Sequence, residues 1–209
     1  MRREQMRRIL TCMFLAGTFS ASLWAGDARL QAIQDDSQAL RSAQVEGKKA
    51  SFFCVNCHGG NGVSKLPEVP NLAGQNADYL LEQTRRFGRG QRKDEFMQGL
   101  IKVLSEEEKI QISLFYAGQN PRPGKPDATL VAKGKQIYNQ LCLRCHGSTA
   151  HGNETIPRLA SQHPEYIVLS VTRYRDKTGE RQEAQMSAAV APLKNADITA
   201  VAAYLNSLP

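Results

Sequence analysis

The chain of 209 residues has few cysteines and almost no long apolar runs. Five cysteines are too few for a disulfide scaffold of this length. The one long apolar run lies at the extreme N-terminus, which excludes a protein with several membrane-spanning helices. No segment alternates apolar and polar residues for long enough to indicate a sheet. With 41% hydrophobic and 22% charged residues, the composition excludes a mainly disordered chain.

Outside the N-terminal segment, basic residues exceed acidic residues by only a small number. The formal net charge is +7, and four of the arginines lie in the first eight positions. Residues 26–120 carry equal numbers of acidic and basic side chains, so the remaining basic excess lies in residues 121–209. This excess is too weak for nucleic-acid binding, which needs a clustered basic stripe. It could orient an acidic protein partner.

The N-terminal segment predicts export. The four arginines precede an apolar run from Ile9 to about Trp24, and the small residue Ala25 follows. This order is typical of a cleaved signal peptide, here residues 1–25, and predicts a periplasmic protein. The run is shorter than the roughly 18 residues of a spanning helix, and an uncleaved anchor is the alternative. Cys12 lies inside the run and would leave with it.

The rest of the sequence repeats itself with a period of about 88 residues, the sign of a duplicated structural unit. A Cys-x-x-Cys-His motif at 54–58 recurs at 142–146. A Pro-x-Leu-Ala-x-Gln segment at 70–75 recurs at 157–162. The prolines between the repeats cannot continue a helix and predict a semi-rigid linker. We therefore predict an extension at residues 26–46, a first domain at 47–118, a linker at 119–127 and a second domain at 128–209.

Helical patterns lie at matching places in the two repeats and predict an all-α fold. Ser105 and Glu108 have the spacing of a capping box, and Asp127 is a plausible N-cap. An apolar helical face runs from Ile198 to Leu205. Each domain is small for a self-sufficient core, so a large apolar cofactor inside each would supply the missing part. The other expected helices cover residues 47–53, 77–87, 106–117, 128–141 and 164–174.

Cys-x-x-Cys-His is the attachment signature of c-type haem. Two thiols three positions apart on one helical turn can each form a thioether with a haem vinyl group, and the adjacent histidine then lies under the iron. A bare Cys-x-x-Cys also allows a zinc site shared by both motifs or a redox disulfide. Neither alternative explains the duplicated histidine. The candidate haem-binding residues are Cys54, Cys57 and His58 in the first domain and Cys142, Cys145 and His146 in the second.

A sixth iron ligand is expected from methionine. Met97 and Met186 are the only methionines after the N-terminal segment, and they lie 39 and 40 residues after the motif histidines. Histidine and methionine on opposite sides of the iron are a standard arrangement in cytochromes c. His151 and His163 are the rival ligands, but neither has a histidine counterpart in the first repeat. We interpret both as surface or loop histidines.

Further residues are candidates for supporting roles. The proximal histidine must donate its other ring N–H to a fixed acceptor, and the carbonyl groups of Pro70 and Pro157 are candidates. Alternatively, both prolines could simply fix the backbone of a turn. Arg86 and Arg173 could pair with haem propionates, or could lie on a solvated helix face.

The ordered set of motifs resembles the cytochrome c4 family, exported proteins with two class I cytochrome c domains. The resemblance covers about residues 47–209. It implies two covalently bound c-type haems that face each other across a pseudo-twofold domain interface. It also implies an electron carrier without enzyme activity, whose partners are redox proteins such as a membrane-bound oxidase or dehydrogenase. Peripheral association with the membrane would suit such partners.

Residues 26–46 are longer than the family's usual leader. Leu30, Ile33, Ser37 and Leu40 fall at helical spacing. The extension could be a helix that caps the first domain, a docking arm or a partly ordered leader.

Two other functions stay open. The protein could be the dihaem subunit of a larger dehydrogenase complex. It could also be an enzyme of the peroxidase or thiosulfate dehydrogenase type, which would need an open iron position. The matching methionine in each repeat argues against such a vacancy.

Overall fold

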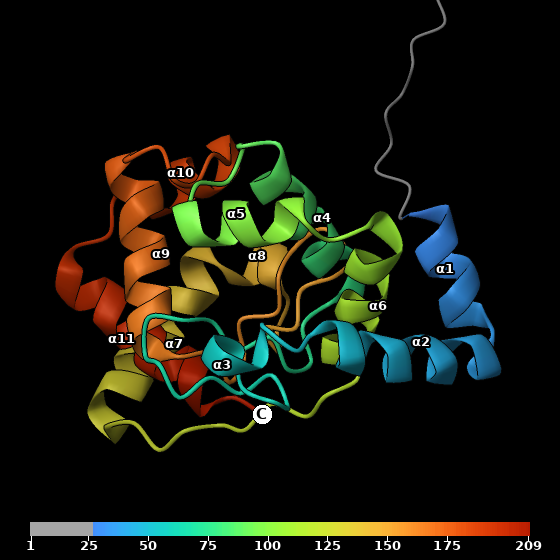
Figure 1. The fold of residues 1–209 in the computed structure, drawn as a ribbon. Coiled ribbons are helices and arrows are strands. Elements are labelled where there is room, and N and C mark those ends of the chain that lie inside the picture. The colour runs from blue at the N-terminus through green and yellow to red at the C-terminus, as the bar shows by residue number, and fades with distance from the viewer. Residues whose placement is uncertain (1–26) are drawn as a thin grey trace, which may run out of the picture.

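The computed structural model describes residues 27–209, which form an all-helical protein (Figure 1). The predicted signal peptide and its cleavage site lie outside the described residues. Within residues 27–209 no helix is both long enough and apolar enough to cross a membrane. The helices are α1 (Ala28–Asp35), α2 (Ser37–Ala50), α3 (Val55–His58), α4 (Ala77–Gly88), α5 (Glu95–Lys102), α6 (Glu106–Ala117), α7 (Ala128–Leu141), α8 (Leu143–His146), α9 (Pro164–Asp176), α10 (Ala184–Val190) and α11 (Asn195–Ser207).

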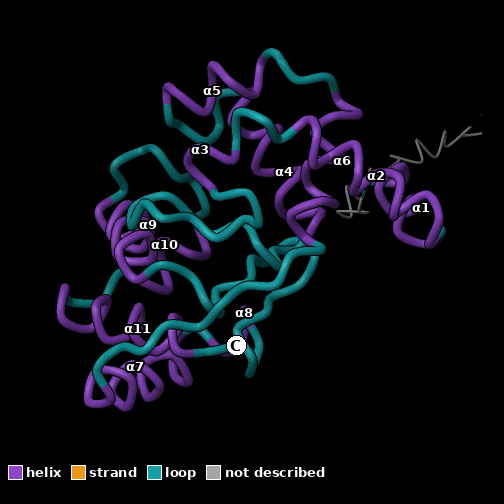
Figure 2. The backbone as a smooth tube through the Cα atoms, turned by 60° about the horizontal axis from the view of Figure 1, so that its bottom comes forward, coloured by secondary structure: helices purple, strands orange, loops and turns teal. Residues whose placement is uncertain are grey.

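The two repeats build the same arrangement of five helices. In the first repeat α2 packs against α6, and α4 packs against both α6 and α5. In the second repeat α7 packs against α11, and α9 packs against both α11 and α10. Figure 2 shows the loops of both repeats gathered between the two sets of helices. The duplicated sequence thus forms a duplicated fold.

Glycine lets the first and last helices of each repeat cross closely. A Cβ atom at Gly47 of α2 would collide with the carbonyl group of Gln111 in α6. A Cβ atom at Gly134 of α7 would collide with the carbonyl group of Ala200 in α11 in the same way. The crossing in each repeat therefore depends on a residue without a side chain.

The first helix of the first repeat is longer than expected. The sequence predicts a helix at residues 47–53, but α2 begins at Ser37, where the Asp36 side chain accepts hydrogen bonds from two backbone N–H groups. The helix therefore crosses the predicted boundary between residues 46 and 47. It ends at Ala50, because Ser51 to Cys54 form turns.

The N-terminal extension contains a further helix, α1, which has no counterpart in the second repeat. Leu30 and Ile33 of α1 are buried against Leu81 of α4 and against Ile110 and Leu114 of α6. Of the roles considered for residues 26–46, a helix that caps the first domain describes this packing, and a partly ordered leader does not.

Three of the helix signals predicted from the sequence are confirmed. Ser105 and Glu108 form the capping box that starts α6. Asp127 accepts backbone hydrogen bonds at the start of α7. The predicted apolar face from Ile198 to Leu205 is buried in the core of the second repeat. Residues 119–127 between the repeats contain no helix.

Candidate haem sites

Each Cys-x-x-Cys-His motif forms a single helical turn that ends in a buried histidine. In α3 the His58 Nδ1–H donates to the carbonyl oxygen of Pro70 at 3.0 Å. In α8 the His146 Nδ1–H donates to the carbonyl oxygen of Pro157 at 3.1 Å. The structure therefore brings each predicted proline to its predicted histidine.

These contacts prepare both rings to bind a metal ion. Burial lowers the pKa of His58 and of His146, although the hydrogen bond to the proline carbonyl opposes this in each case. Both imidazoles are therefore neutral at pH 7. Because Nδ1 carries the proton that is donated to the proline, the lone pair is left on Nε2.

The four cysteines are unpaired and lie around one cavity. Cys54, Cys57, Cys142 and Cys145 form no disulfide with one another. Burial raises the pKa of Cys54, and it raises the pKa of Cys142 to about 11. Within residues 27–209 no three His, Cys, Asp or Glu side chains converge on a point that could hold a metal ion, as a shared zinc site would require.

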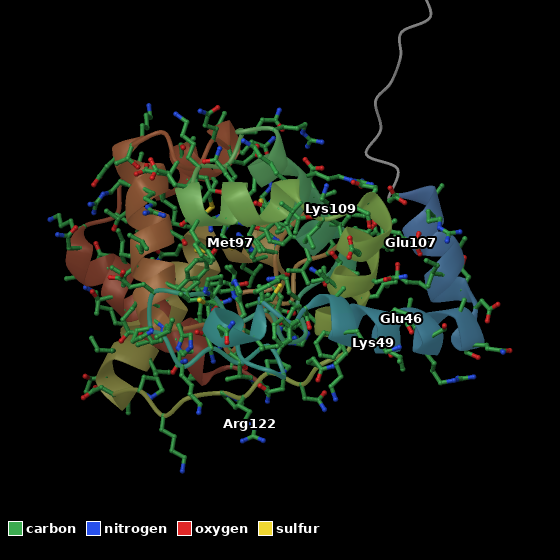
Figure 3. All side chains as sticks on the ribbon, viewed as in Figure 1. Glu46, Lys49, Met97, Glu107, Lys109 and Arg122 are labelled. Atoms are coloured by element: carbon green, nitrogen blue, oxygen red, sulfur yellow. The ribbon has the colours of Figure 1, made fainter. Side chains whose placement is uncertain are left out.

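A cavity of about 1150 Å³ joins the two motifs. This volume exceeds the roughly 300–1,000 Å³ of most small-molecule sites. Met97 of α5 and Met186 of α10 both line the cavity, as do the four cysteines and the two motif histidines. Met97 lies where α5 borders the interior of the molecule (Figure 3). The sequence-predicted attachment residues and ligands of both repeats therefore share one continuous space.

Two glutamines join the repeats in a reciprocal manner. The Gln162 side chain accepts from the Asn71 N–H at 2.7 Å and donates to the Asn71 carbonyl oxygen at 3.0 Å. The Gln75 side chain accepts from the Arg158 N–H at 2.8 Å and donates to the Arg158 carbonyl oxygen at 2.9 Å. Gln75 and Gln162 are the last residues of the two Pro-x-Leu-Ala-x-Gln segments. Their exchange of bonds is the pseudo-twofold relation that the sequence resemblance implies.

The residues after these glutamines add to the interface. Asn76 donates to the carbonyl groups of His151, Asn153 and Ile156. His163, which occupies the matching place in the second repeat, has its Nε2 2.8 Å from the carbonyl oxygen of Ser64. His163 is therefore a half-buried loop histidine, and the loop places it at the interface between the repeats. His151 is exposed, as expected.

Both arginines that the sequence singled out, Arg86 and Arg173, line the cavity, and their pairing with haem propionates stays a prediction. Arg86 forms ion pairs with Glu82, one helical turn away, and with Glu183 of the second repeat. Arg173 lines the cavity. Arg92 and Arg181 were missed, although a signal exists: each follows a glycine by two positions and precedes its methionine by five.

Arg92 and Arg181 meet at the junction of the repeats. Arg92 donates to the hydroxyl of Tyr166 at 3.0 Å, and Arg181 donates to the same hydroxyl. Burial alone would raise the pKa of Tyr166, but the two guanidinium groups lower it to about 8. Arg181 is only 9% exposed, and none of the ion pairs among residues 27–209 involves it. This junction is a buried cationic site.

The residues present fit haem. The cavity offers thiols for covalent attachment, neutral imidazoles and apolar walls. It also holds buried cations that could pair with the two carboxylates of a haem. The Nε of Arg158 lines the same cavity and is buried without a hydrogen-bond partner, which is costly unless an anion completes the site.

Known proteins share both the fold and the motifs. The cytochrome c family model matches residues 131–209. Cytochrome c4 of Pseudomonas aeruginosa is 32% identical, over 78% of this chain and 87% of that protein. The reduced cytochrome c4 of Pseudomonas stutzeri superposes with a TM-score of 0.73 at 28% identity, covering 78% of this chain and 97% of that one. A thiosulfate dehydrogenase electron acceptor of Thiomonas intermedia is 27% identical, over 98% of this chain and 92% of that protein.

The duplicated fold and the duplicated site define a dihaem c-type cytochrome, an electron-transfer protein with two tandem class I cytochrome c domains and two covalently bound haems. The chain belongs to the cytochrome c4 family.

Proposed function

We propose that the protein is a periplasmic electron carrier whose irons are held by His58 and Met97 in the first domain and by His146 and Met186 in the second. The observation that carries this proposal is the single cavity lined by both motifs and both methionines. Bound haem supplies an iron that cycles between ferric and ferrous states. We take the first domain to include α1 and α2 as well as residues 47–118, and the second to be residues 128–209.

The chain's own residues keep the ligands in place. The carbonyl oxygens of Pro70 and Pro157 fix the ring orientation of the two histidines. The helical turns α3 and α8, with the cysteines that precede them, place all four cysteines and both histidines on the wall of one cavity. A site that moves little between oxidation states costs little reorganisation when an electron arrives.

Export supports a periplasmic location, because residues 1–25 have the order of a signal peptide. On this proposal a dehydrogenase or another respiratory donor reduces the protein, and a terminal acceptor such as an oxidase reoxidises it. Peripheral contact with the membrane would bring the protein to a membrane-bound partner.

One specific donor is favoured by the role of a relative. The thiosulfate dehydrogenase electron acceptor of Thiomonas intermedia is 27% identical and aligns over 92% of its own length. We therefore propose a thiosulfate dehydrogenase as the donor. The protein could serve as a free carrier or as a subunit of that complex, but not as the dehydrogenase itself, because each domain has its own methionine for the sixth position.

Ligand substitution tests the assignment of the irons. In Met97→Ala and Met186→Ala, one iron loses its sixth ligand and should bind carbon monoxide after reduction. We expect each variant to bind carbon monoxide at one of its two haems. A variant that binds none would show that its methionine is not a ligand. Leu100→Ala, which removes another apolar side chain of α5 that lines the cavity, is the matched control and should bind none.

A further inference from the structure

The two methionines at the cavity occupy the same place in two short helices. Met97 is the third residue of α5, and Met186 is the third residue of α10. Their N-cap residues, Asp94 and Glu183, therefore lie three positions before them. A backbone N–H group in the first turn of a helix has no partner inside the helix. The N-cap residue therefore decides how the backbone of each methionine is held.

The first domain holds its methionine with a local cap. The Asp94 side chain accepts a hydrogen bond from the Met97 backbone N–H at 2.9 Å. The Gln98 side chain in turn accepts from the Asp94 backbone N–H at 3.2 Å. Both bonds lie within α5 and its cap. The backbone of Met97 is therefore fixed by residues of its own helix.

The second domain holds the matching helix differently. Glutamate is not among the preferred N-cap residues, and Glu183 forms no capping hydrogen bond within the part of the chain that the structure describes. Its carboxylate instead lies 3.5 Å from the Nη1 of Arg86, in α4 of the first domain. The Glu183 carbonyl oxygen accepts from the Ser187 N–H at 2.9 Å, so the backbone of Glu183 sets the start of α10. The start of α10 is therefore tied to the opposite domain.

A second bond between the domains joins the loops that precede the two helices. The Lys93 backbone N–H donates to the carbonyl oxygen of Glu180 at 3.1 Å. For α5 this bond adds to the local cap at Asp94. For α10 it adds to the ion pair with Arg86, which also comes from the first domain. Both methionine helices are thus supported by residues of the first domain.

We propose that Asp94 is a positioning residue for Met97, and that Arg86 positions Met186 from the opposite domain through Glu183. This inference rests on the proposed function, in which both methionines are iron ligands. The sixth ligand of the first iron is then held by its own domain, whereas that of the second iron depends on contact between the domains. Asp94, Arg86 and Glu183 bind no iron themselves and act through the starts of the two helices.

Imidazole binding to the ferric holoprotein tests the role of Asp94, because imidazole must displace the methionine. In a Met186→His background, only the first iron keeps a methionine ligand. We expect Asp94→Ala to raise the imidazole affinity of this iron about fivefold, the effect of losing a typical N-cap. Asp94→Asn keeps a capping oxygen and should bind imidazole as its parent does. Equal affinity in Asp94→Ala and its parent would overturn the role of Asp94, as would the same increase in Asp94→Asn.

A double-mutant cycle tests the route from Arg86 to the second iron, in a Met97→His background. We expect Arg86→Gln to raise the imidazole affinity of the second iron about twofold, the effect of one partly exposed ion pair. It should have no further effect when Glu183→Gln is already present. Arg89→Gln removes another exposed partner of Glu82 from the end of α4, and should change nothing. An effect of Arg86→Gln that persists in Glu183→Gln would overturn the route through Glu183.

The wild-type spectrum separates this inference from the proposed function. Ferric haem with a methionine ligand has a far-red charge-transfer band. A wild-type protein without this band would overturn the ligand assignment, and the inference with it. A wild-type protein with the band, whose variants bind imidazole as their parents do, would overturn the inference alone.

Discussion

The cysteine and histidine side chains of the two motifs could be assigned from spacing alone, because haem attachment demands a fixed local pattern. Met97 and Met186 lie far from the motifs in sequence, and their role as ligands stays a prediction. The arginines were predicted only in part, because Arg86 and Arg173 line the cavity but Arg92 and Arg181 were missed. Arg86 lies one helical turn after Glu82 and pairs with it. The spacing of four residues permits this ion pair in a helix, but the sequence alone does not show that the pair forms. Arg92 and Arg181 become visible as a pair only when the fold brings both to the hydroxyl of Tyr166.

Removing the buried charge of Arg181 should lower the midpoint potential of the second haem. A nearby positive charge disfavours the oxidised iron, and the effect is strong where water is excluded. We expect Arg181→Gln to shift this potential downward in a spectroelectrochemical titration. Lys135→Gln, which removes an exposed charge from α7, should leave it unchanged. Equal potentials in Arg181→Gln and wild type would contradict a role for Arg181 at the haem.

At the scale of elements, the helices were largely predictable, because caps and apolar faces are local features. Asp127 begins α7, and the capping box at Ser105 begins α6, as their patterns indicate. The length of α2 was missed although Asp36 is the same kind of N-cap residue as Asp127, because residues 37–46 carry few large apolar side chains to mark a continuous helical face. The packing of α1 depends on the apolar faces of α4 and α6, which are distant in sequence, so spacing alone could not choose between a cap and a loose leader.

Leu30 should anchor α1 to the first domain. Its side chain is fully buried, and truncating such a leucine costs about 2–5 kcal/mol. We expect Leu30→Ala to lower the free energy of unfolding of the first domain by an amount in this range, measured by denaturant titration. Val45→Ala, at an exposed position of α2, should change it by less than about 0.5 kcal/mol. Similar stabilities for the two variants would contradict the packing of α1.

An ion pair should make the attachment of α1 depend on pH. Burial acts to raise the pKa of Asp27, but hydrogen bonds from Arg85 and from backbone N–H groups lower it below its usual range. Arg85 Nη2 lies 2.6 Å from Asp27 Oδ2, and the same guanidinium also contacts Glu106 of α6.

A carboxylate with a lowered pKa stabilises the fold above its unfolded value of about 4, and this contribution is lost as the pH falls through the folded value. Asp27→Asn keeps the capping oxygen and removes the charge. We expect it to cost at most about 1 kcal/mol at pH 7, with the difference from wild type shrinking as the pH falls below about 4. A difference that stays the same as the pH falls below about 4 would contradict the ion pair as its cause.

At the scale of the whole molecule, the duplication was readable from the sequence, but the way the two halves meet was not. Only the structure shows that Gln75 and Gln162 bond to the backbone of the opposite repeat. The two domains also differ in charge at matched positions. Arg158 has an unpartnered Nε at the cavity, whereas its counterpart Asn71 uses its side-chain amide to bond to Ser161.

This difference predicts that the haem of the second domain has the higher potential. Electrons would then run from the first domain to the second. Met97→His and Met186→His identify the two waves of a potentiometric titration, because replacing methionine with histidine as a ligand lowers the potential. We expect Met186→His to displace the higher wave of the wild type. Displacement of the higher wave by Met97→His would reverse the predicted order.

The central claim is that both irons are closed by ligands from the chain. It is tested most directly by optical spectra of the purified exported protein, oxidised and reduced, with and without carbon monoxide, and with haem quantified on the same sample. The account predicts two covalent low-spin haems per chain and no spectral change with carbon monoxide. A haem that binds carbon monoxide readily in the wild type would mean an open iron, and would contradict a role confined to electron transfer.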